Sequence, residues 1–165
     1  MTESPLFLAA AALCRELTAG CVRPPTQSSS GWFRIFHRED PSQELDRHRA
    51  ALAADPRDTL AVWRTARFVE RIGYPDLATV LLSELHKRRP SDPKPAAALA
   101  QLFLARARRP GRGLAAQLKD YDRFVRYADR ALAHGAPREP LDALKTAAAV
   151  EVTMLKGQYD LGGVR

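Results

Sequence analysis

Apolar residues between positions 59 and 92 recur at helical spacing in two runs, separated by a glycine and closed by a proline. Gly73 ends the first run and Pro90 ends the second, and both residue types commonly follow a helix. Side chains three and four residues apart share one face, so each run predicts an amphipathic helix that must pack on a neighbour. The positions expected to pack are Val62, Thr65, Ala66, Val69, Ala78, Leu82 and Leu85.

Comparable start and stop signals predict helices along most of the chain. Asp40 is suited to an N-cap and Pro41 to the first helical position, and a basic last turn ends the helix at 75–89. Strand patterns are lacking, so we expect an all-α fold with seven or eight helices in antiparallel pairs. The expected helices span about 5–19, 32–36, 40–55, 59–72, 75–89, 93–108, 114–134 and 139–156, the last one ending at Gly157.

The helix pair at 59–92 resembles a tetratricopeptide repeat, a unit of 34 residues. Gly73 matches the turn glycine, Ala66 and Ala78 match the small residues of the two helices, and Pro90 matches the closing proline. Small residues where two helices cross let their backbones approach closely. Three positions depart from the family pattern. Val62 stands where the family has an aromatic residue, Thr65 where it has leucine and Val69 where it has tyrosine.

Traces of the same repeat flank this unit. Pro56 takes the closing position one repeat earlier, with Ala51 on a packing position, while the loop at 109–113 lengthens the following unit. LKGQYD at 155–160 resembles the turn of a further repeat. The resemblance covers about 40–160 and implies a short right-handed α-solenoid of antiparallel helix pairs. The first-helix packing positions of the following unit are Ala96, Leu99, Ala100 and Phe103.

The sequence divides into four segments. We expect an N-terminal helix in 1–20, a linker loop at 21–31, a tetratricopeptide-like domain at 32–160 and a tail at 161–165. The linker is marked by paired prolines and a serine run. The short apolar helix that opens the domain is expected to cap the stack, and an exposed plug for a partner is the alternative.

Tetratricopeptide stacks bind partners in a groove lined by the first helix of each repeat, so the resemblance implies partner-binding positions. Trp63 lies off the packing positions, and tryptophan is a frequent interface anchor. With Arg67 and Arg71 it favours a peptide with an aromatic or apolar anchor and acidic flanks; packing of Trp63 on the preceding helix is the alternative. The implied positions are Leu60, Trp63, Arg67, Glu70 and Arg71 on the central repeat, and Lys94, Ala97, Gln101, Leu104 and Ala105 on the next.

The charge of the chain adds an alternative class of partner. The net charge is +7 and the isoelectric point is near 9.9, but arginines alternate with acidic residues, as in QELDRHR. A nucleic-acid binder gathers its basic residues on one face. A protein or peptide partner is therefore favoured, and a basic nucleic-acid-binding protein is the alternative.

The sequence contains no recognisable catalytic or metal-binding constellation. The histidines at 37, 48, 86 and 134 stand among charged residues and are expected on the surface. Cys14 and Cys21 are too few for a disulfide framework and lack zinc spacing. We therefore expect neither enzymatic activity nor a cofactor or metal. Two pairs spaced as solvent-facing helix ion pairs are Asp46 with Arg49 and Asp122 with Arg126.

The apolar run PLFLAAAALC near the start allows two interpretations. The sequence LTAGC just after it resembles a bacterial lipoprotein cleavage box, which would anchor the chain in the envelope at Cys21. The preceding MTES carries Glu3 and no basic residue, which departs from the charge pattern of an export signal. Because the export-signal pattern fails on this charge rule, we favour a helix and a cytoplasmic location. No run in the sequence approaches the ~18 apolar residues of a membrane span.

These features together favour a non-enzymatic adaptor or scaffold that binds a protein or peptide. A tetratricopeptide-like secretion chaperone is a narrower alternative. Self-association through the incomplete repeat at the C-terminal end is left open by the sequence.

Overall fold

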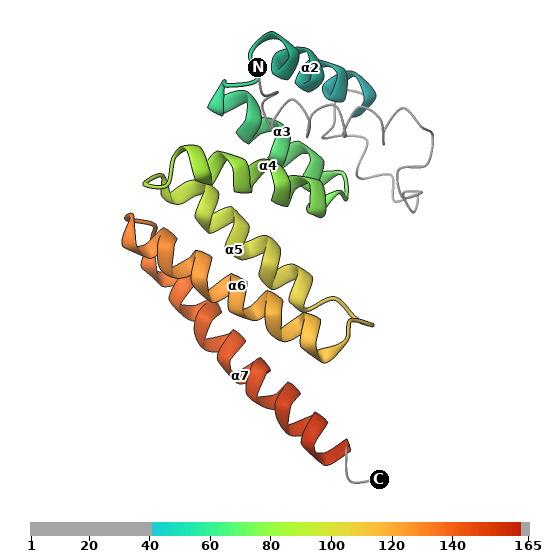
Figure 1. The fold of residues 1–165 in the computed structure, drawn as a ribbon, viewed down its shortest axis with the longest axis vertical. Coiled ribbons are helices and arrows are strands. Elements are labelled where there is room, and N and C mark those ends of the chain that lie inside the picture. The colour runs from blue at the N-terminus through green and yellow to red at the C-terminus, as the bar shows by residue number, and fades with distance from the viewer. Residues whose placement is uncertain (1–40, 163–165) are drawn as a thin grey trace, which may run out of the picture. The chain divides into compact units, whose positions relative to one another are not determined.

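The described part of the chain is entirely helical. The computed structural model describes residues 41–162, and this range contains six helices and no strand (Figure 1). The all-α prediction is confirmed for this part, and the predicted bounds of the first five of these helices agree to within one residue. The predicted helices at 5–19 and 32–36 and the linker at 21–31 lie outside the described residues. The helices are α2 (Pro41–Ala54), α3 (Thr59–Arg71), α4 (Pro75–Arg88), α5 (Pro93–Ala107), α6 (Leu114–Ala133) and α7 (Arg138–Gly162).

The chain forms two compact units that divide between Arg88 and Arg89. The described helices of the first unit are α2, α3 and α4, and those of the second unit are α5, α6 and α7. Within each unit every helix packs on its neighbour in sequence, and the pairs α3–α4 and α5–α6 pack most extensively. The division falls inside the range 32–160, which the sequence assigned to one domain.

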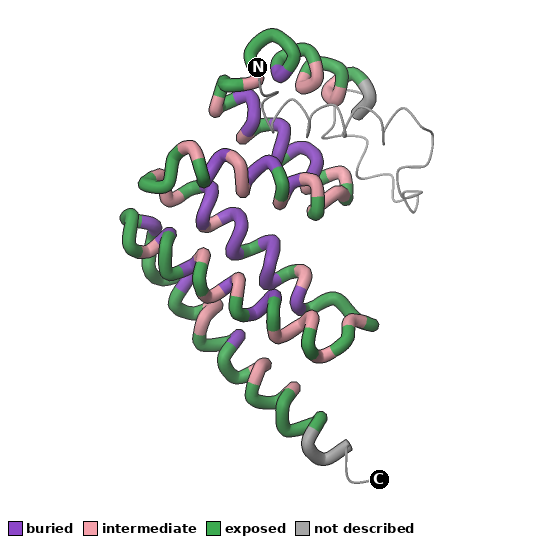
Figure 2. Tube along the Cα trace, in the orientation of Figure 1, coloured by how far each residue is buried: buried purple, intermediate pink, exposed green. Residues whose placement is uncertain are grey.

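The core of the first unit includes the positions that the helical spacing predicted, together with others such as Phe68 and Leu81 (Figure 2). All seven packing positions expected in 59–92 are buried, and Ala66 and Ala78 have no exposed surface. On α2, Ala51 is exposed and the adjacent Leu52 is 3 % exposed, so the packing position predicted there is wrong by one residue. The reason is that burying leucine removes more apolar surface from water than burying alanine.

Local signals determine where the helices begin and end. Asp58 and Asp92 are the N-caps of α3 and α5, and their carboxylates accept from the backbone N–H two residues on, at 2.8 and 3.0 Å. Gly73 has a φ of +96°, and the N–H of Tyr74 donates to the carbonyl of Val69 at 2.8 Å. This is the glycine helix end that the sequence predicted.

The last helix is longer than the sequence predicted. α7 continues through Gly157 to Gly162, so the predicted stop at Gly157 and the predicted turn at 155–160 are wrong. Gly157 lacks the positive φ found at the turn glycines Gly73 and Gly135. A single glycine inside a helix costs about 1 kcal/mol relative to alanine, which weakens a helix without ending it.

Gly73 and Gly157 provide a matched pair of test positions. Gly73→Ala places a Cβ in a left-handed conformation and should lower the free energy of unfolding of the first unit by about 1 kcal/mol. Gly157→Ala should leave that free energy unchanged and increase helical content. Urea unfolding and far-UV circular dichroism measure the two effects. Loss of helical content in Gly157→Ala would mean that position 157 forms a turn after all.

Candidate partner-binding surface

α3 presents a row of side chains on the side opposite its packed face. Leu60 is 50 % exposed, Arg67 and Arg71 are exposed, and Trp63 and Glu70 are partly buried. All five positions that the resemblance implies on α3 are therefore at least partly accessible. We call these five residues the α3 row.

Arg67 lies near Trp63 while it is paired with Glu70. Its guanidinium donates to the Glu70 carboxylate at 2.6 Å and lies 6.0 Å from the centroid of the Trp63 ring. A cation–π contact extends to about 6 Å, so Arg67 is at its outer limit. Because Glu70 neutralises Arg67, this end of the α3 row is dominated by the apolar surfaces of Trp63 and Leu60.

Arg71 connects the α3 row to α2. Its guanidinium donates to the carboxylate of Glu44 at 2.6 Å and lies 5.4 Å from the centroid of the Phe68 ring. Glu44 is outside the predicted set, because no helical spacing connects positions on two different helices. The second arginine of the row is thus also partly neutralised, and the row carries less positive charge than its sequence indicates.

Two histidines that were expected on the surface are partly or fully buried. His48 of α2 packs on Phe68 with ring centroids 4.9 Å apart, and burial lowers its pKa below 6.5 against the opposing effect of Glu44. His86 is 8 % exposed. The surface prediction is wrong for both, because an imidazole ring can fill a packing position between helices. The histidine at 134 is exposed, and the one at 37 lies outside the described residues.

On α5, four of the five implied positions are accessible and one is not. Lys94, Gln101 and Ala105 are exposed, and Ala97 is partly buried. Leu104 is only 3 % exposed, so the prediction that it contributes to a binding surface is wrong. α5 is apolar around most of its circumference, and a helix of that kind buries more than one stripe.

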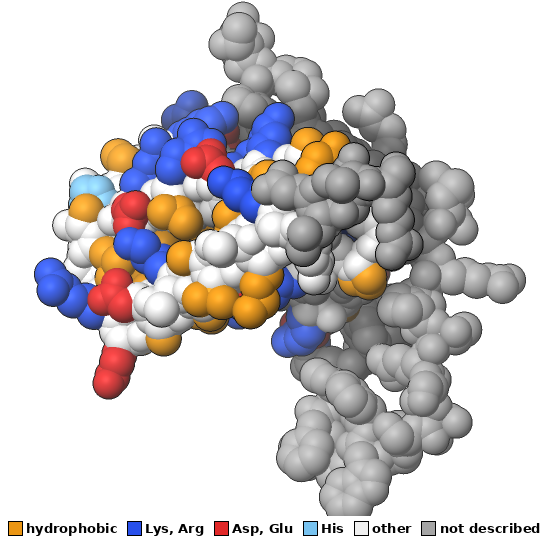
Figure 3. Space-filling model, turned by 90° about the horizontal axis from the view of Figure 1, so that it is seen from below, with side chains coloured by type: hydrophobic (Ala, Val, Ile, Leu, Met, Phe, Trp, Pro, Cys, Tyr) orange, Lys and Arg blue, Asp and Glu red, His pale blue; other side chains and the backbone are white. Residues whose placement is uncertain are grey.

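Basic side chains are interspersed with other types on the part of the surface drawn in Figure 3. Lys and Arg lie there beside acidic and hydrophobic side chains. The two arginines of the α3 row follow the same rule, since each has an acidic neighbour. The pattern differs from the single basic face of a typical nucleic-acid binder.

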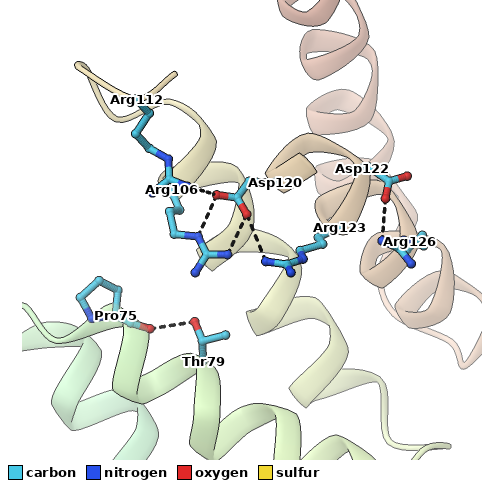
Figure 4. Close-up of polar contacts among 8 residues, drawn as sticks. All are labelled: Pro75, Thr79, Arg106, Arg112, Asp120, Asp122, Arg123 and Arg126. Carbon is cyan, nitrogen blue, oxygen red and sulfur yellow. Dashed lines mark hydrogen bonds and ion pairs between the residues drawn. The ribbon is translucent and has the colours of Figure 1, made fainter. Parts of the chain in front are cut away.

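A buried carboxylate in the second unit gathers three arginines (Figure 4). Asp120 of α6 is 1 % exposed and accepts from Arg106 through two nitrogens, at 2.8 and 2.7 Å. Arg112 donates to it at 2.9 Å and Arg123 at 3.5 Å. The arginines come from α5, from the loop at 109–113 and from α6. The cluster therefore joins the two helices across their connecting loop, and the forked contact of Arg106 is the strongest kind of ion pair.

These arginines keep Asp120 ionised inside the fold. Burial by itself raises a carboxyl pKa, but the hydrogen bonds and positive charges of the arginines outweigh it and hold the pKa of Asp120 below its usual value. Arg106 and Arg123 also lie against the ring of Phe103, at 4.8 and 5.4 Å from its centroid. We call Asp120 and its three arginines the clasp. Because three arginines surround one carboxylate, the clasp carries an excess of positive charge.

A second polar network connects α7 to the α5–α6 pair. Arg108, the C-cap of α5, donates to the carboxylate of Glu151 at 3.0 and 2.7 Å, and the Tyr121 hydroxyl donates to it at 2.6 Å. Burial and the bond to Glu151 raise the pKa of Tyr121 to about 12, while Arg108 lowers the pKa of Glu151. The three side chains come from three helices, so their contacts hold the middle of α7 in place.

Helical spacing in the sequence identified the short-range ion pairs correctly. Arg49 lies 3.1 Å from Asp46, and Arg126 lies 2.6 Å from Asp122, as the spacing predicted. Both pairs are solvent-facing, where an ion pair contributes well under about 1 kcal/mol.

The two networks of the second unit were missed because most of their contacts join one helix to another or to a loop. Arg108 and Glu151 are 43 residues apart, and no helical spacing relates them. One signal for the clasp was present. Asp120 stands four and eight residues before Phe124 and Ala128, which are fully buried. A carboxylate on that line must lie on the packed face and needs a cationic partner.

The described residues show no further chemical centre. Between 41 and 162 no group of three or more His, Cys, Asp or Glu side chains is arranged to hold a metal ion. None of the helices there is both long enough and apolar enough to cross a membrane. Family models, curated proteins and solved structures were compared with this chain, and none of them matches it.

Asp120→Asn tests the clasp. The variant leaves three arginines facing a neutral amide, so we expect it to lower the free energy of unfolding by about 3 kcal/mol at neutral pH. The lowered pKa of Asp120 means that its contribution is present above the unfolded-state pKa of about 3.9 and is lost as the pH falls through the lower folded-state value. Urea denaturation from pH 7 to pH 3 measures both effects.

Asp122→Asn is the matched control for this experiment. It removes the same charge from the same helix but breaks only the exposed pair with Arg126, so the loss should be below about 1 kcal/mol. Equal losses in Asp120→Asn and Asp122→Asn, or a difference that persists unchanged at pH 3, would contradict the clasp.

Proposed function

We propose that the chain is a non-enzymatic, tetratricopeptide-like helical-repeat protein that binds a protein or peptide on its first helices, α3 and α5. The observation that carries this proposal is a repeated pattern of burial. Four buried positions of α3 each have a buried counterpart in α5 one 34-residue unit later. The pairs are Val62 with Ala96, Thr65 with Leu99, Ala66 with Ala100 and Val69 with Phe103.

The helix starts follow the same spacing. Asp58 and Asp92 cap α3 and α5 in the same way, and positions 58 and 92 also differ by one repeat length. Two helices with the same cap and the same buried register are equivalent members of successive units. This equivalence supports α3–α4 and α5–α6 as repeats of a short right-handed α-solenoid.

The exposed side of α3 indicates how a partner would be recognised. Packing of α3 uses its buried face, yet Leu60 remains half exposed and Trp63 partly exposed on the other side. Tryptophan at a surface commonly anchors a binding partner. Trp63 and Leu60 would contact an apolar side chain of the partner. A carboxylate of the partner would replace Glu70 in the ion pair with Arg67.

The location proposed for this function is the cytoplasm.

Substitution of Trp63 tests the proposed surface. Affinity-tagged wild-type and Trp63→Ala chains are used to isolate partners from the native cell, and the affinity of each recovered partner is measured with purified proteins. We expect Trp63→Ala to weaken binding by about 30-fold, the effect of a strong interface anchor of about 2 kcal/mol.

Val80→Ala serves as the control, because Val80 is a 52 % exposed apolar residue on α4, outside the α3 row. It should bind as the wild type does. Wild-type affinity in a folded Trp63→Ala chain would remove the α3 row as the binding surface. Recovery of nucleic acid in place of a protein, with affinity that falls steeply as salt rises, would overturn the proposal in favour of a nucleic-acid binder.

A further inference from the structure

The positive charge of the chain is concentrated in one part of the second unit. Residues 106–130, which form the end of α5, the following loop and most of α6, contain eight Lys or Arg and three Asp. Their net charge is therefore +5, out of the +7 of the whole chain. An uneven distribution of this kind produces a local potential that attracts partners of the opposite charge.

Four of these basic residues lie in line along one side of α6. They follow each other at intervals of four, three and four residues, which places them on a single side of the helix over about 16 Å. Three of them are exposed, and the side chain of Arg123 is 35 % exposed. We call this line the α6 basic stripe, and its residues are Lys119, Arg123, Arg126 and Arg130.

Two members of the stripe have a carboxylate neighbour. Arg126 lies 2.6 Å from Asp122, and both side chains of this pair are more than half exposed. Arg123 shares Asp120 with two other arginines, and its distance of 3.5 Å is the longest in the clasp (Figure 4). Both arginines keep N–H groups for a further acceptor, because a guanidinium group has five donors.

The other two members have no acidic neighbour. Among the described residues, no carboxylate lies within ion-pair distance of Lys119 or Arg130. Like charges three or four residues apart on a helix repel each other and weaken the helix. A line of four cations is therefore unfavourable for α6 alone, and an acidic partner would remove the repulsion.

We propose that the α6 basic stripe binds an acidic segment of a protein partner. Three of its four members are arginines, whose guanidinium groups can pair with a carboxylate through two parallel hydrogen bonds. A partner helix with Asp or Glu at the same intervals would match the stripe over about three turns, and an extended segment of about five residues would also span it. The stripe lies on the second unit, so this contact is separate from the α3 row and does not depend on the role proposed for α3.

The surroundings of the stripe favour a protein segment over a nucleic acid. Proteins that bind single strands stack the bases on open aromatic rings. Tyr127, the aromatic residue of α6 nearest to the stripe, is partly buried, stacks on Phe103 with ring centroids 5.5 Å apart, and has the Arg130 guanidinium 5.5 Å from its own centroid. Asp122 and Asp129 are exposed along the opposite edge of the stripe, where a broad polyanion such as a duplex would contact their carboxylates.

Fluorescence anisotropy with a labelled decaglutamate peptide tests the stripe on the full chain. At about 0.15 M salt, charges more than roughly 8 Å apart are largely screened, so the affinity reports local contacts. We expect the double variant Lys119→Gln with Arg130→Gln to bind the peptide about fivefold more weakly than the wild type, because it loses two exposed ion pairs.

The matched control is the double variant Arg138→Gln with Lys156→Gln. It also removes one Arg and one Lys from exposed positions of the second unit, but on α7. Its affinity should change by less than about twofold, and circular dichroism should show equal helical content in all three chains. A folded Trp63→Ala chain should bind the peptide as the wild type does, so a failure of the α3 row and a failure of the stripe are distinguishable.

Zero-length carbodiimide coupling locates the bound peptide. The reagent joins a carboxylate to a lysine amine where the two are in contact, and Lys119 is the one lysine of the stripe. Mass spectrometry should find the peptide attached to Lys119 in preference to Lys94 and Lys156, which are also exposed.

Four results would overturn the proposal. A wild-type chain that does not bind the peptide would remove the stripe as an acidic-segment site. Equal losses of affinity in the two double variants would mean that the peptide responds only to net charge. Attachment mainly at Lys94 or Lys156 would place the contact elsewhere. Tighter binding of a ten-residue deoxythymidine strand than of the peptide would assign the positive surface to a nucleic acid.

Discussion

Close packing of helices through small, fully buried side chains is the constraint on which the rest of the structure depends. Ala66 and Ala78 have no exposed surface in the first unit, and the same holds for Ala100 and Ala128 in the second. Side chains of this size let neighbouring helices approach, and larger residues fill the space around them. α3 thereby has one side committed to the core, and its other side carries the partly exposed Trp63.

Several charged residues join one helix to another, and others form pairs within a single helix. The chain has 26 basic and 19 acidic residues, yet many of the described arginines have a carboxylate neighbour. The clasp at Asp120 fixes α5 to α6, and the network at Glu151 fixes α7 to both. The recognition that we propose for the α3 row therefore rests more on its apolar surface than on the overall positive charge. Of the partner features expected from the sequence, an apolar anchor with acidic flanks, the pairing of both arginines gives more weight to the apolar anchor.

Most of the features that the sequence predicted correctly depend on residues that are close together in the chain. The seven core positions of 59–92, the turn at Gly73 and the bounds of α2 to α6 follow from spacing and caps, which are local. Gly157 was misjudged because glycine ends a helix only where the chain also takes up a positive φ, and the sequence alone does not reveal the backbone angle. The core position of Leu104 and the clasp at Asp120 depend on contacts between helices. The five residues of the α3 row are at least partly accessible, as the resemblance implied. The pairing of Arg71 with Glu44 could be seen only in the structure.

Side-chain oxidation by hydroxyl radicals, compared between the free chain and its complex with a recovered partner, tests the central claim most directly. Trp63 is partly exposed on the proposed binding side of α3, while Tyr159 is 68 % exposed on α7, outside the α3 row. The account predicts that the partner slows oxidation of Trp63 and leaves that of Tyr159 unchanged. Unchanged oxidation of Trp63 in a saturated complex would contradict it.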